Sequence, residues 1–259
     1  MPFTIAHAAA VLPLQKTGRS RMPLAALMIG SMSPDFAYFL PVGLNRASSH
    51  DLEGILFFCL PVGLAMWLLF VRLLERPTIE LLPEAWRARV PRSDQGLGLQ
   101  ALLFGSLAVV LGALTHVAWD AFTHANTPIT AAFPVFNARL SIFSGHPIRV
   151  YLLLQYLSSV IGLLALAWWG WNLRRAPLPG RVAAEAASSL SDRARIIALL
   201  AVITSSGVSA LYSYASNLHG PFQARVFHLL IGGMTGWALA WMAVALWINS
   251  RAPAPRRRS

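Results

Sequence analysis

The segment Thr115–His124, with the sequence THVAWDAFTH, carries three side chains that could bind a metal ion. His116, Asp120 and His124 follow one another at intervals of four residues, which places them on one face of a helix. Neighbours on this stripe then lie about 6 Å apart along the helix axis, and the two histidines about 12 Å apart. Since bonds from zinc to nitrogen or oxygen are only ~2.0 to 2.2 Å long, we expect neighbours to share an ion, but not all three residues. Asp120, in the middle, could bridge two ions.

This stripe ends an apolar run that is typical of a membrane-spanning helix. An ionised carboxylate at the centre of such a helix costs about 2.5 to 3.5 kcal/mol on insertion scales, and it is tolerated when it is paired or faces water. A helix end that has reached the membrane interface would explain a single polar residue. Three polar residues on one face favour a common partner.

The composition is that of a membrane protein. Of the 259 residues, 56% are hydrophobic and 12% are charged, whereas about 25% of the residues of a soluble domain are charged. A helix needs about 20 apolar residues to cross the hydrocarbon layer. The stretches that we expect to span are Gly54–Leu74, Leu97–Phe122, Tyr151–Leu173, Ala194–Ala215 and Val226–Asn249.

The predicted fold is therefore an all-α, multi-pass transmembrane helical bundle, with about five spanning helices after an N-terminal helical segment. Residues 1–250 are expected to form a single integral-membrane domain, and residues 251–259, RAPAPRRRS, a basic disordered tail. Residues 22–44 could form a further span, but Ser33, Pro34 and Asp35 would then lie at mid-depth of the membrane, which argues against it.

The basic residues indicate how the chain is oriented. The net charge is +11, and the side that receives the loops after spans one, three and five holds twice as many Lys and Arg residues as the other side. By the positive-inside rule, these loops lie in the cytoplasm. The charge then serves topology, and no nucleic-acid partner is expected. The opening MPFTIAHAAAVLPL has no basic region before its apolar run, so we expect no cleaved signal peptide.

More residues of metal-binding type fall on the extracytoplasmic side in this arrangement. They are His7, Asp35, His50, His124 and His146. His116 and Asp120 lie at the end of the span that faces the same side, and no histidine falls in a predicted cytoplasmic loop. We therefore expect a cell-membrane protein with its candidate site on the extracytoplasmic face.

Four segments resemble one uncharacterised family of bacterial multi-pass membrane proteins: FTIAHAAAVLPL, SMSPDFAYFL, SSHDLEG and GALTHVAWDAFTH. Their ordered set is a His, a Pro-Asp pair, a His, and then His-x-x-x-Asp followed by another His. This order is similar to that of membrane-bound metal-dependent hydrolases and to the ligand order of zinc-dependent phospholipase C. The resemblance covers most of residues 1–160.

The phospholipase pattern implies a first metal ion held by four residues: Asp35, His50, His116 and Asp120. Asp120 would also bridge to an ion contacted by His7, and His124 would belong to a further ion. Asp35 stands where the resemblance implies a general base. Asp35 and Asp120 are thus the implied catalytic residues.

The sequence departs from the phospholipase pattern at its end. The pattern continues with His-x-x-x-Glu, whereas His146 is followed four residues later by Val150, and no acidic residue lies between Asp120 and Glu185. The N-terminal residue that binds metal in the secreted enzymes also has no counterpart, because Met1 is expected to be retained. A complete three-metal site is therefore not expected.

The chemistry of such a site is hydrolysis. A metal ion with an open position polarises a phosphoryl or carbonyl oxygen and lowers the pKa of a water molecule that it binds towards ~7. We predict a membrane-bound, metal-dependent hydrolase of phosphoester bonds in lipid or amphiphilic substrates, with zinc, or else manganese, as cofactor and membrane lipid as partner. The alternative is a non-enzymatic transporter or metal-binding membrane protein, in which buried His and Asp relay ions. Haem binding is disfavoured because His116 and His124 share one helix. The sequence does not indicate an oligomeric state.

Overall fold

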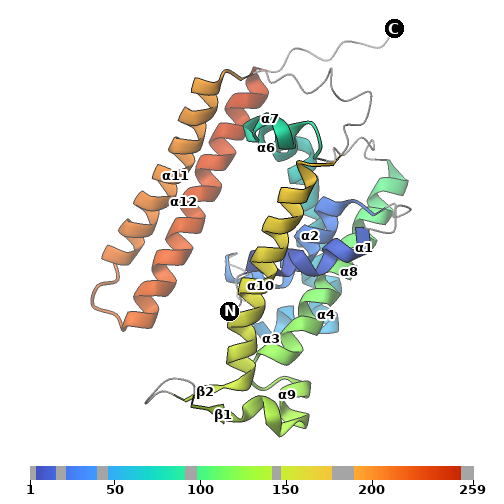
Figure 1. The fold of residues 1–259 in the computed structure, drawn as a ribbon, viewed down its shortest axis with the longest axis vertical. Coiled ribbons are helices and arrows are strands. Elements are labelled where there is room, and N and C mark those ends of the chain that lie inside the picture. Colours follow the sequence, from blue (N-terminus) through green and yellow to red (C-terminus); the bar gives the residue numbers. More distant parts are fainter. Residues whose placement is uncertain are drawn as a thin grey trace. The chain divides into compact units, whose positions relative to one another are not determined.

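The computed structural model describes residues 4–15, 22–39, 46–90, 98–141, 147–176 and 190–251. The described chain is almost entirely helical (Figure 1). It divides into two compact units, of which unit 1 comprises Met1–Leu68 and Ser93–Asn172, and unit 2 comprises Leu69–Arg92 and Leu173–Ser259. The single membrane domain expected over residues 1–250 stays a prediction, and residues 252–259 of the basic tail lie outside the described residues.

Within the described residues, five helices are long and apolar enough to cross a membrane. They are Leu52–Leu81, Leu99–Ala132, Val150–Leu173, Asp192–Ala215 and Ala224–Ser250. Their number and their places confirm the prediction of an all-α, multi-pass bundle. Residues 22–44 are not among them, because their described part contains a nine-residue α-helix, α2 (Leu24–Met32), followed by a 3₁₀ helix.

Unit 1 begins with short helical pieces and contains two of the long helices. Its short pieces are η1 (Thr4–Val11), α1 (Leu12–Gln15), α2, η2 (Ser33–Tyr38), α3 (Arg46–Ser49), α4 (Leu52–Gly54), the π-helical turn η3 (Ile55–Cys59) and α5 (Leu60–Leu69). After these come α8 (Leu99–Thr123), α9 (Pro128–Ala132), η5 (Pro134–Asn137), the two-residue strands β1 (Arg139–Leu140) and β2 (Ile148–Arg149), and α10 (Val150–Leu173). The strands pair antiparallel, with Arg139 opposite Arg149. The N-terminal helical segment is therefore present as a chain of short helices.

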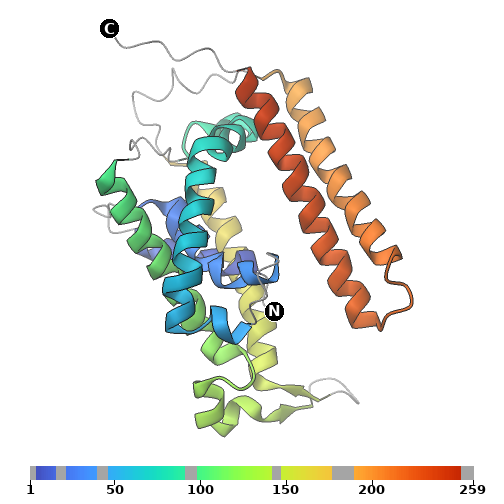
Figure 2. The ribbon, with the colours of Figure 1, turned by 180° about the vertical axis from the view of Figure 1, so that it is seen from behind.

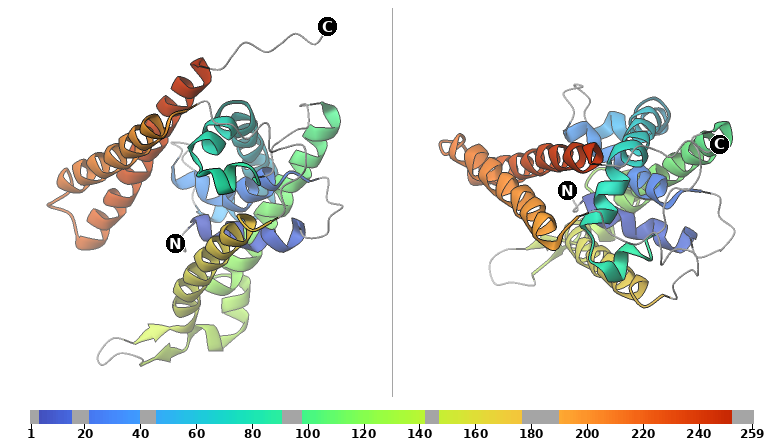
Figure 3. Two further views of the ribbon diagram at one scale, coloured as in Figure 1. Left: turned by 45° about the horizontal axis from the view of Figure 1, so that its top comes forward. Right: turned by 90° about the horizontal axis from the view of Figure 1, so that it is seen from above.

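Helix α2 lies directly against α8 because both helices have glycine at the contact. A Cβ atom added to Gly30 would lie 2.6 Å from the Cα atom of Val109, and one added to Gly112 would lie 2.6 Å from the amide nitrogen of Ser31. Any larger side chain at these two positions would push the backbones apart. Figure 3 shows η1 and α2 (blue) beside α8 (green). This contact brings the end of α2 to the polar stripe of α8.

The first spanning helix also packs on α8 (Figure 2). A Cβ atom added to Gly63 would meet the side chain of Val109, and one added to Gly105 would meet the ring of the buried Trp67. A buried apolar cluster of residues from η2, η3 and α8 continues this interface. Its members are Ala37, Ile55, Phe58, Cys59 and Ala113. The cluster fixes η2, and with it Asp35, beside α8.

Unit 2 contains a pair of long antiparallel helices, α11 (Asp192–Ala215) and α12 (Phe222–Ser250), drawn in orange and red in Figure 1. They pack closely through small residues, since Ser205 Oγ donates to Gly236 O at 3.1 Å and Ser206 Oγ donates to Gly233 O at 2.8 Å. The remaining elements of unit 2 are the π-helical turn η4 (Phe70–Leu74), α6 (Glu75–Leu81) and α7 (Glu84–Arg87).

The first spanning helix does not end at Leu74 as the sequence suggested, but continues to Leu81. The added part of the helix contains Pro77, which has no amide proton to donate to the carbonyl of Leu73 one turn earlier. In the structure, Asn249 Nδ2 donates to Leu73 O at 2.8 Å. This side-chain amide replaces the missing backbone donor and lets the helix pass through the proline.

Candidate metal centre

Two residues of the polar stripe lie on the buried face of α8. His116 is 0% exposed and Asp120 is 3% exposed. The helix ends at Thr123, and His124 has extended backbone, with φ −127° and ψ 153°. The next helix, α9, starts at once with Thr127 and Thr130 as a capping box, and Thr130 Oγ1 donates to His124 O at 3.0 Å. His124 therefore does not occupy a third helical turn, and its Nδ1 lies 3.4 Å from Asp120 Oδ1.

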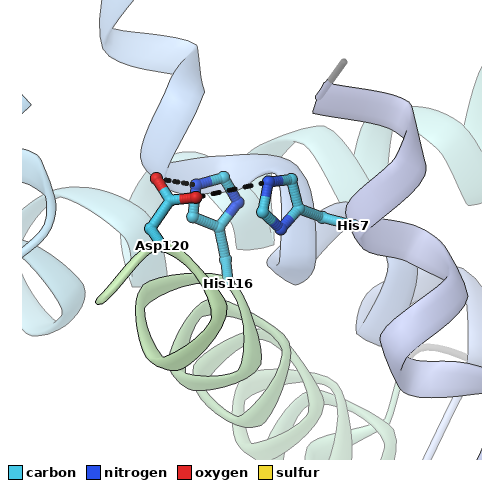
Figure 4. A group of neighbouring side chains, drawn as sticks. All are labelled: His7, His116 and Asp120. Carbon is cyan, nitrogen blue, oxygen red and sulfur yellow. Dashed lines mark ion pairs between the residues drawn. The ribbon is translucent and has the colours of Figure 1, made fainter. Parts of the chain in front are cut away.

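His7 reaches the same carboxylate from η1. Its Nε2 lies 3.6 Å from Asp120 Oδ1, while His116 Nε2 lies 3.5 Å from Asp120 Oδ2, so the two oxygens face different histidines (Figure 4). The rings of His7 and His116 are stacked, with centroids 3.8 Å apart and planes 20° from parallel. Burial lowers the pKa of His7 to about 3. The His7 ring is neutral at pH 7.

Asp35 and His50 close the other side of the cluster. Asp35, in η2, is 3% exposed. Its Oδ2 accepts a hydrogen bond from Thr4 Oγ1 at 2.7 Å, and its Oδ1 lies 3.7 Å from Nε2 of both His50 and His116. His50 Nε2 also lies 3.4 Å from Asp120 Oδ2. Four segments distant in sequence thus present nitrogen and oxygen atoms to one small volume.

The separations in this cluster are those of metal ligands. The nitrogen–oxygen distances from His7, His50 and His116 to the two carboxylates lie between 3.4 and 3.7 Å. Hydrogen bonds from N–H to oxygen are shorter, about 2.7 to 3.2 Å. Two ligands of one tetrahedral ion with bonds of ~2.0 to 2.2 Å lie about 3.3 to 3.6 Å apart. The spacing therefore leaves room for an ion between the atoms.

Three of the histidine nitrogens that face the carboxylates lack a hydrogen bond in the part of the chain that the structure describes. Nε2 of His7, His50 and His116 is buried and has no hydrogen-bond partner within the described residues. Leaving a buried polar atom unsatisfied costs about 1 to 3 kcal/mol. Three such atoms beside two buried carboxylates are an arrangement that a bound cation would satisfy.

Neighbouring groups orient two of these rings. His116 Nδ1 lies 2.7 Å from Ser31 O, to which it donates, because a carbonyl oxygen can only accept. The Nε2 lone pair is then free to bind a cation, an orientation that metal-binding histidines usually have. His50 Nδ1 lies 2.9 Å from Ser49 Oγ, which can hold this ring in the same way.

Among the residues that the structure describes, two groups of three residues have ligand atoms within 4.8 Å of one another. They are His7 with His116 and Asp120, and Asp35 with His50 and His116. Both groups combine imidazole nitrogen with carboxylate oxygen. Calcium and magnesium prefer oxygen ligands alone, whereas this mixture suits zinc and first-row transition metals.

His124 belongs to neither group. Its Nε2 lies 3.3 Å from Gln155 Nε2 on α10, and its Nδ1 lies 3.3 Å from Thr123 Oγ1 as well as near Asp120. Its expected place at a further ion stays a prediction. His146 lies outside the described residues.

Three residues that contact the cluster were not found by sequence reasoning: Thr4, Ser31 and Gln155. Gln155 could have been found, because it is a polar residue in an apolar span, and it is only 4% exposed. Thr4 gave no indication in the sequence, and Ser31 acts through its backbone carbonyl, which every residue has. Their roles arise from packing.

Comparison with known proteins identifies a family of unknown function. Residues 1–247 match the family model described as Domain of unknown function (DUF4184). No curated protein and no solved structure matches the sequence.

Proposed function

We propose that this chain, which belongs to the DUF4184 family, is a membrane-bound, metal-dependent hydrolase that cleaves phosphoester bonds in lipid or amphiphilic substrates. One observation carries the proposal: two buried carboxylates meet three buried imidazole nitrogens that have no hydrogen-bond partner within the described residues. Burying a carboxylate costs several kcal/mol unless a cation or hydrogen-bond donors compensate its charge. A divalent cation would compensate both carboxylates and all three nitrogens.

Four atoms would hold the first ion. They are Asp35 Oδ1, His50 Nε2, His116 Nε2 and Asp120 Oδ2. The four nitrogen–oxygen separations of 3.4 to 3.7 Å among these atoms support this assignment. Two histidines and two carboxylates suit zinc, with manganese as the second choice.

Asp120 would also contribute to a second ion. Its Oδ1 is directed away from the first set and lies 3.6 Å from His7 Nε2 and 3.4 Å from His124 Nδ1. A carboxylate that uses one oxygen for each ion can hold two ions near each other, as in two-metal hydrolases. Asp120 is therefore the residue whose loss affects both positions.

The bound ion supplies two effects: it lowers the pKa of a water molecule and stabilises negative charge on a phosphoryl oxygen. Asp35 acts as general base and accepts a proton from the attacking water. Thr4 holds Asp35 Oδ2 at 2.7 Å, which keeps Oδ1 directed at the cluster. The water oxygen forms a bond to phosphorus, the ester P–O bond breaks, and the leaving alcohol oxygen takes up the proton.

The site faces the extracytoplasmic side of the cell membrane. The excess of Lys and Arg on the side away from it supports this orientation. His116 and Asp120 lie in the last two turns of α8, at the end opposite the basic connector that precedes the helix.

The test measures metal content and turnover in the whole purified chain without an affinity tag. Wild type loaded with zinc or manganese is compared with Asp120→Asn, and Asp192→Asn serves as matched control because the Asp192 side chain is 88% exposed. We expect bound metal and hydrolysis of phospholipids or soluble phosphoesters in wild type and in the control, and neither in Asp120→Asn. Equal turnover in all three proteins would exclude this site as the catalyst, and a metal-free wild type would favour the transporter.

A further inference from the structure

A cavity of about 190 Å³ adjoins the candidate metal centre inside unit 1. It lies between η1, α8 and α10, and the ring of His7 forms part of its wall. The other lining residues are mostly small or apolar, and they include Ala9, Trp119, Gly162 and Ala165. A ligand in this cavity would thus touch a residue of the cluster at one end and apolar groups elsewhere.

The serine residues of the wall add little polarity to the cavity. Ser158 Oγ and Ser159 Oγ both donate to Gln155 O, at 3.1 and 2.8 Å. Their hydroxyl protons are therefore used within α10. The cavity is suited to a hydrocarbon group rather than to a sugar or a peptide.

The cavity extends from the cluster towards the middle of a spanning helix. Helix α10 passes the cluster at Gln155, whose Nε2 lies 3.3 Å from His124 Nε2. Ala165, the last lining residue, lies about 15 Å further along the helix axis. Since α10 runs from Val150 to Leu173, this part of the cavity lies at the depth of the hydrocarbon layer.

The rim of the cavity is apolar and exposed on unit 1. Ile161, which lines the cavity, is 64% exposed, and the neighbouring Leu164 is also 64% exposed. Of the described residues of α10, Gln155 and Gly162 are the buried ones. In a spanning helix, an apolar exposed surface contacts lipid. The cavity can therefore be entered from the side, by a chain that never leaves the hydrocarbon layer.

We infer that this cavity binds an acyl chain of a glycerophospholipid substrate while the phosphoester lies at the metal centre; the inference rests on the proposed function. An apolar cavity of ~150 Å³ in a protein core takes up benzene, so 190 Å³ holds several methylene groups of a chain. The polar end of the cavity at His7 and its apolar end at Ala165 match the order of phosphate and chain in such a lipid.

The first experiment measures chain binding without any catalysis. Phosphatidylglycerol with a diazirine in its acyl chain is photolysed with the full-length protein, and the labelled peptides are mapped. Ala165→Phe and Ala9→Leu fill the cavity from two walls, and Leu164→Phe, on the exposed face beside Ala165, is the control. We expect labelling of α10 within residues 158–165 in wild type and control, and its loss in both cavity variants.

The expected loss of lipid binding follows from the number of methylene groups that the cavity buries. Losing contact with about three methylene groups weakens binding about fiftyfold. The inference would be overturned if α10 were labelled equally in Ala165→Phe and Leu164→Phe, and if Ala9→Leu were labelled as strongly as wild type. Labelling spread evenly over α10, α11 and α12 would do so as well, because it would show only general contact with lipid.

The second experiment separates this inference from the proposed function. Hydrolysis of dioleoyl and dihexanoyl phosphatidylglycerol is compared, and we expect wild type to prefer the long chain by kcat/KM about fiftyfold. Ala165→Phe should lose this preference while its metal content stays that of wild type. If wild type turns over neither lipid and holds no metal, the proposed function fails, and the photolabelling still decides on the cavity. Equal rates on both lipids in wild type would refute the inference and leave the hydrolase standing.

Discussion

Asp120→Asn should remove the effect of metal on thermal stability. In wild type, the Asp120 carboxylate lies within 3.4 to 3.6 Å of four histidine nitrogens, and each of its oxygens faces a different set. The amide of Asn has one acceptor oxygen and no charge. The variant therefore loses a ligand at both ion positions, while the size of the side chain is kept and the packing of α8 is unchanged.

The size of the shift in Tm follows from the binding of metal to the folded state. Zinc at about one hundred times its Kd stabilises the folded chain by about 2.7 kcal/mol. For a chain of this size, each kcal/mol raises the Tm by about 2 to 4 °C, so metal should raise the wild-type Tm by roughly 5 to 10 °C. In Asp120→Asn the shift should fall below about 1 °C, because Kd rises above the zinc concentration used.

The assay is thermal unfolding in detergent, with the protein first stripped by chelator and then titrated with zinc. Asp192→Asn, which removes an exposed carboxylate from unit 2, should show the full wild-type shift. A shift of the same size in Asp120→Asn would refute the reasoning, since it would locate the stabilising ion elsewhere.

Three more predictions concern the surroundings of the site and the fold. Thr4→Val should lower kcat about tenfold with metal content unchanged, because it removes the hydroxyl group that holds Oδ2 of the general base Asp35. Thr4→Ser keeps this hydroxyl group and should retain the wild-type rate. A loss of metal in Thr4→Val would contradict this role of Thr4. Asn249→Leu should lower the free energy of unfolding by about 1 to 3 kcal/mol, because Leu73 O loses its hydrogen bond. Adding Pro77→Ala should recover most of this loss by restoring a backbone donor to Leu73 O. Thermal unfolding of the single and double variants measures both effects, and additive losses would disprove the compensation. In a cysteine-free background, Val135→Cys should react with an impermeant maleimide in intact cells and Arg175→Cys should not; the opposite labelling pattern would reverse the proposed orientation.

The spans could be predicted from the sequence because length and hydropathy alone decide whether a helix fits the membrane. The pairing of His116 with Asp120 could also be predicted, since a spacing of four residues fixes the shared face. The place of His124 could not. It depends on where α8 stops, and the capping box of Thr127 and Thr130 sets that point.

The remaining ligand candidates were found by a different route. His7, Asp35 and His50 were grouped by the order of a resembling family, and spacing alone does not bring such distant residues together. Their approach depends on the glycine contact between α2 and α8 and on the apolar cluster that holds η2. Thr4 could not be predicted, because its role arises only when η1 lies beside η2.

The distribution of the cluster over the chain has a consequence for biosynthesis. His7, Asp35 and His50 leave the ribosome well before His116 and Asp120, which arrive only with the second spanning helix. Until α8 has been inserted and has docked against α2, the early residues form no complete ligand set, and an ion that met them would exchange freely. Under the proposed function, metal is therefore taken up only after α8 has been inserted into the membrane. A biosynthetic intermediate that lacks α8 should contain no metal when the membrane insertion machinery releases it.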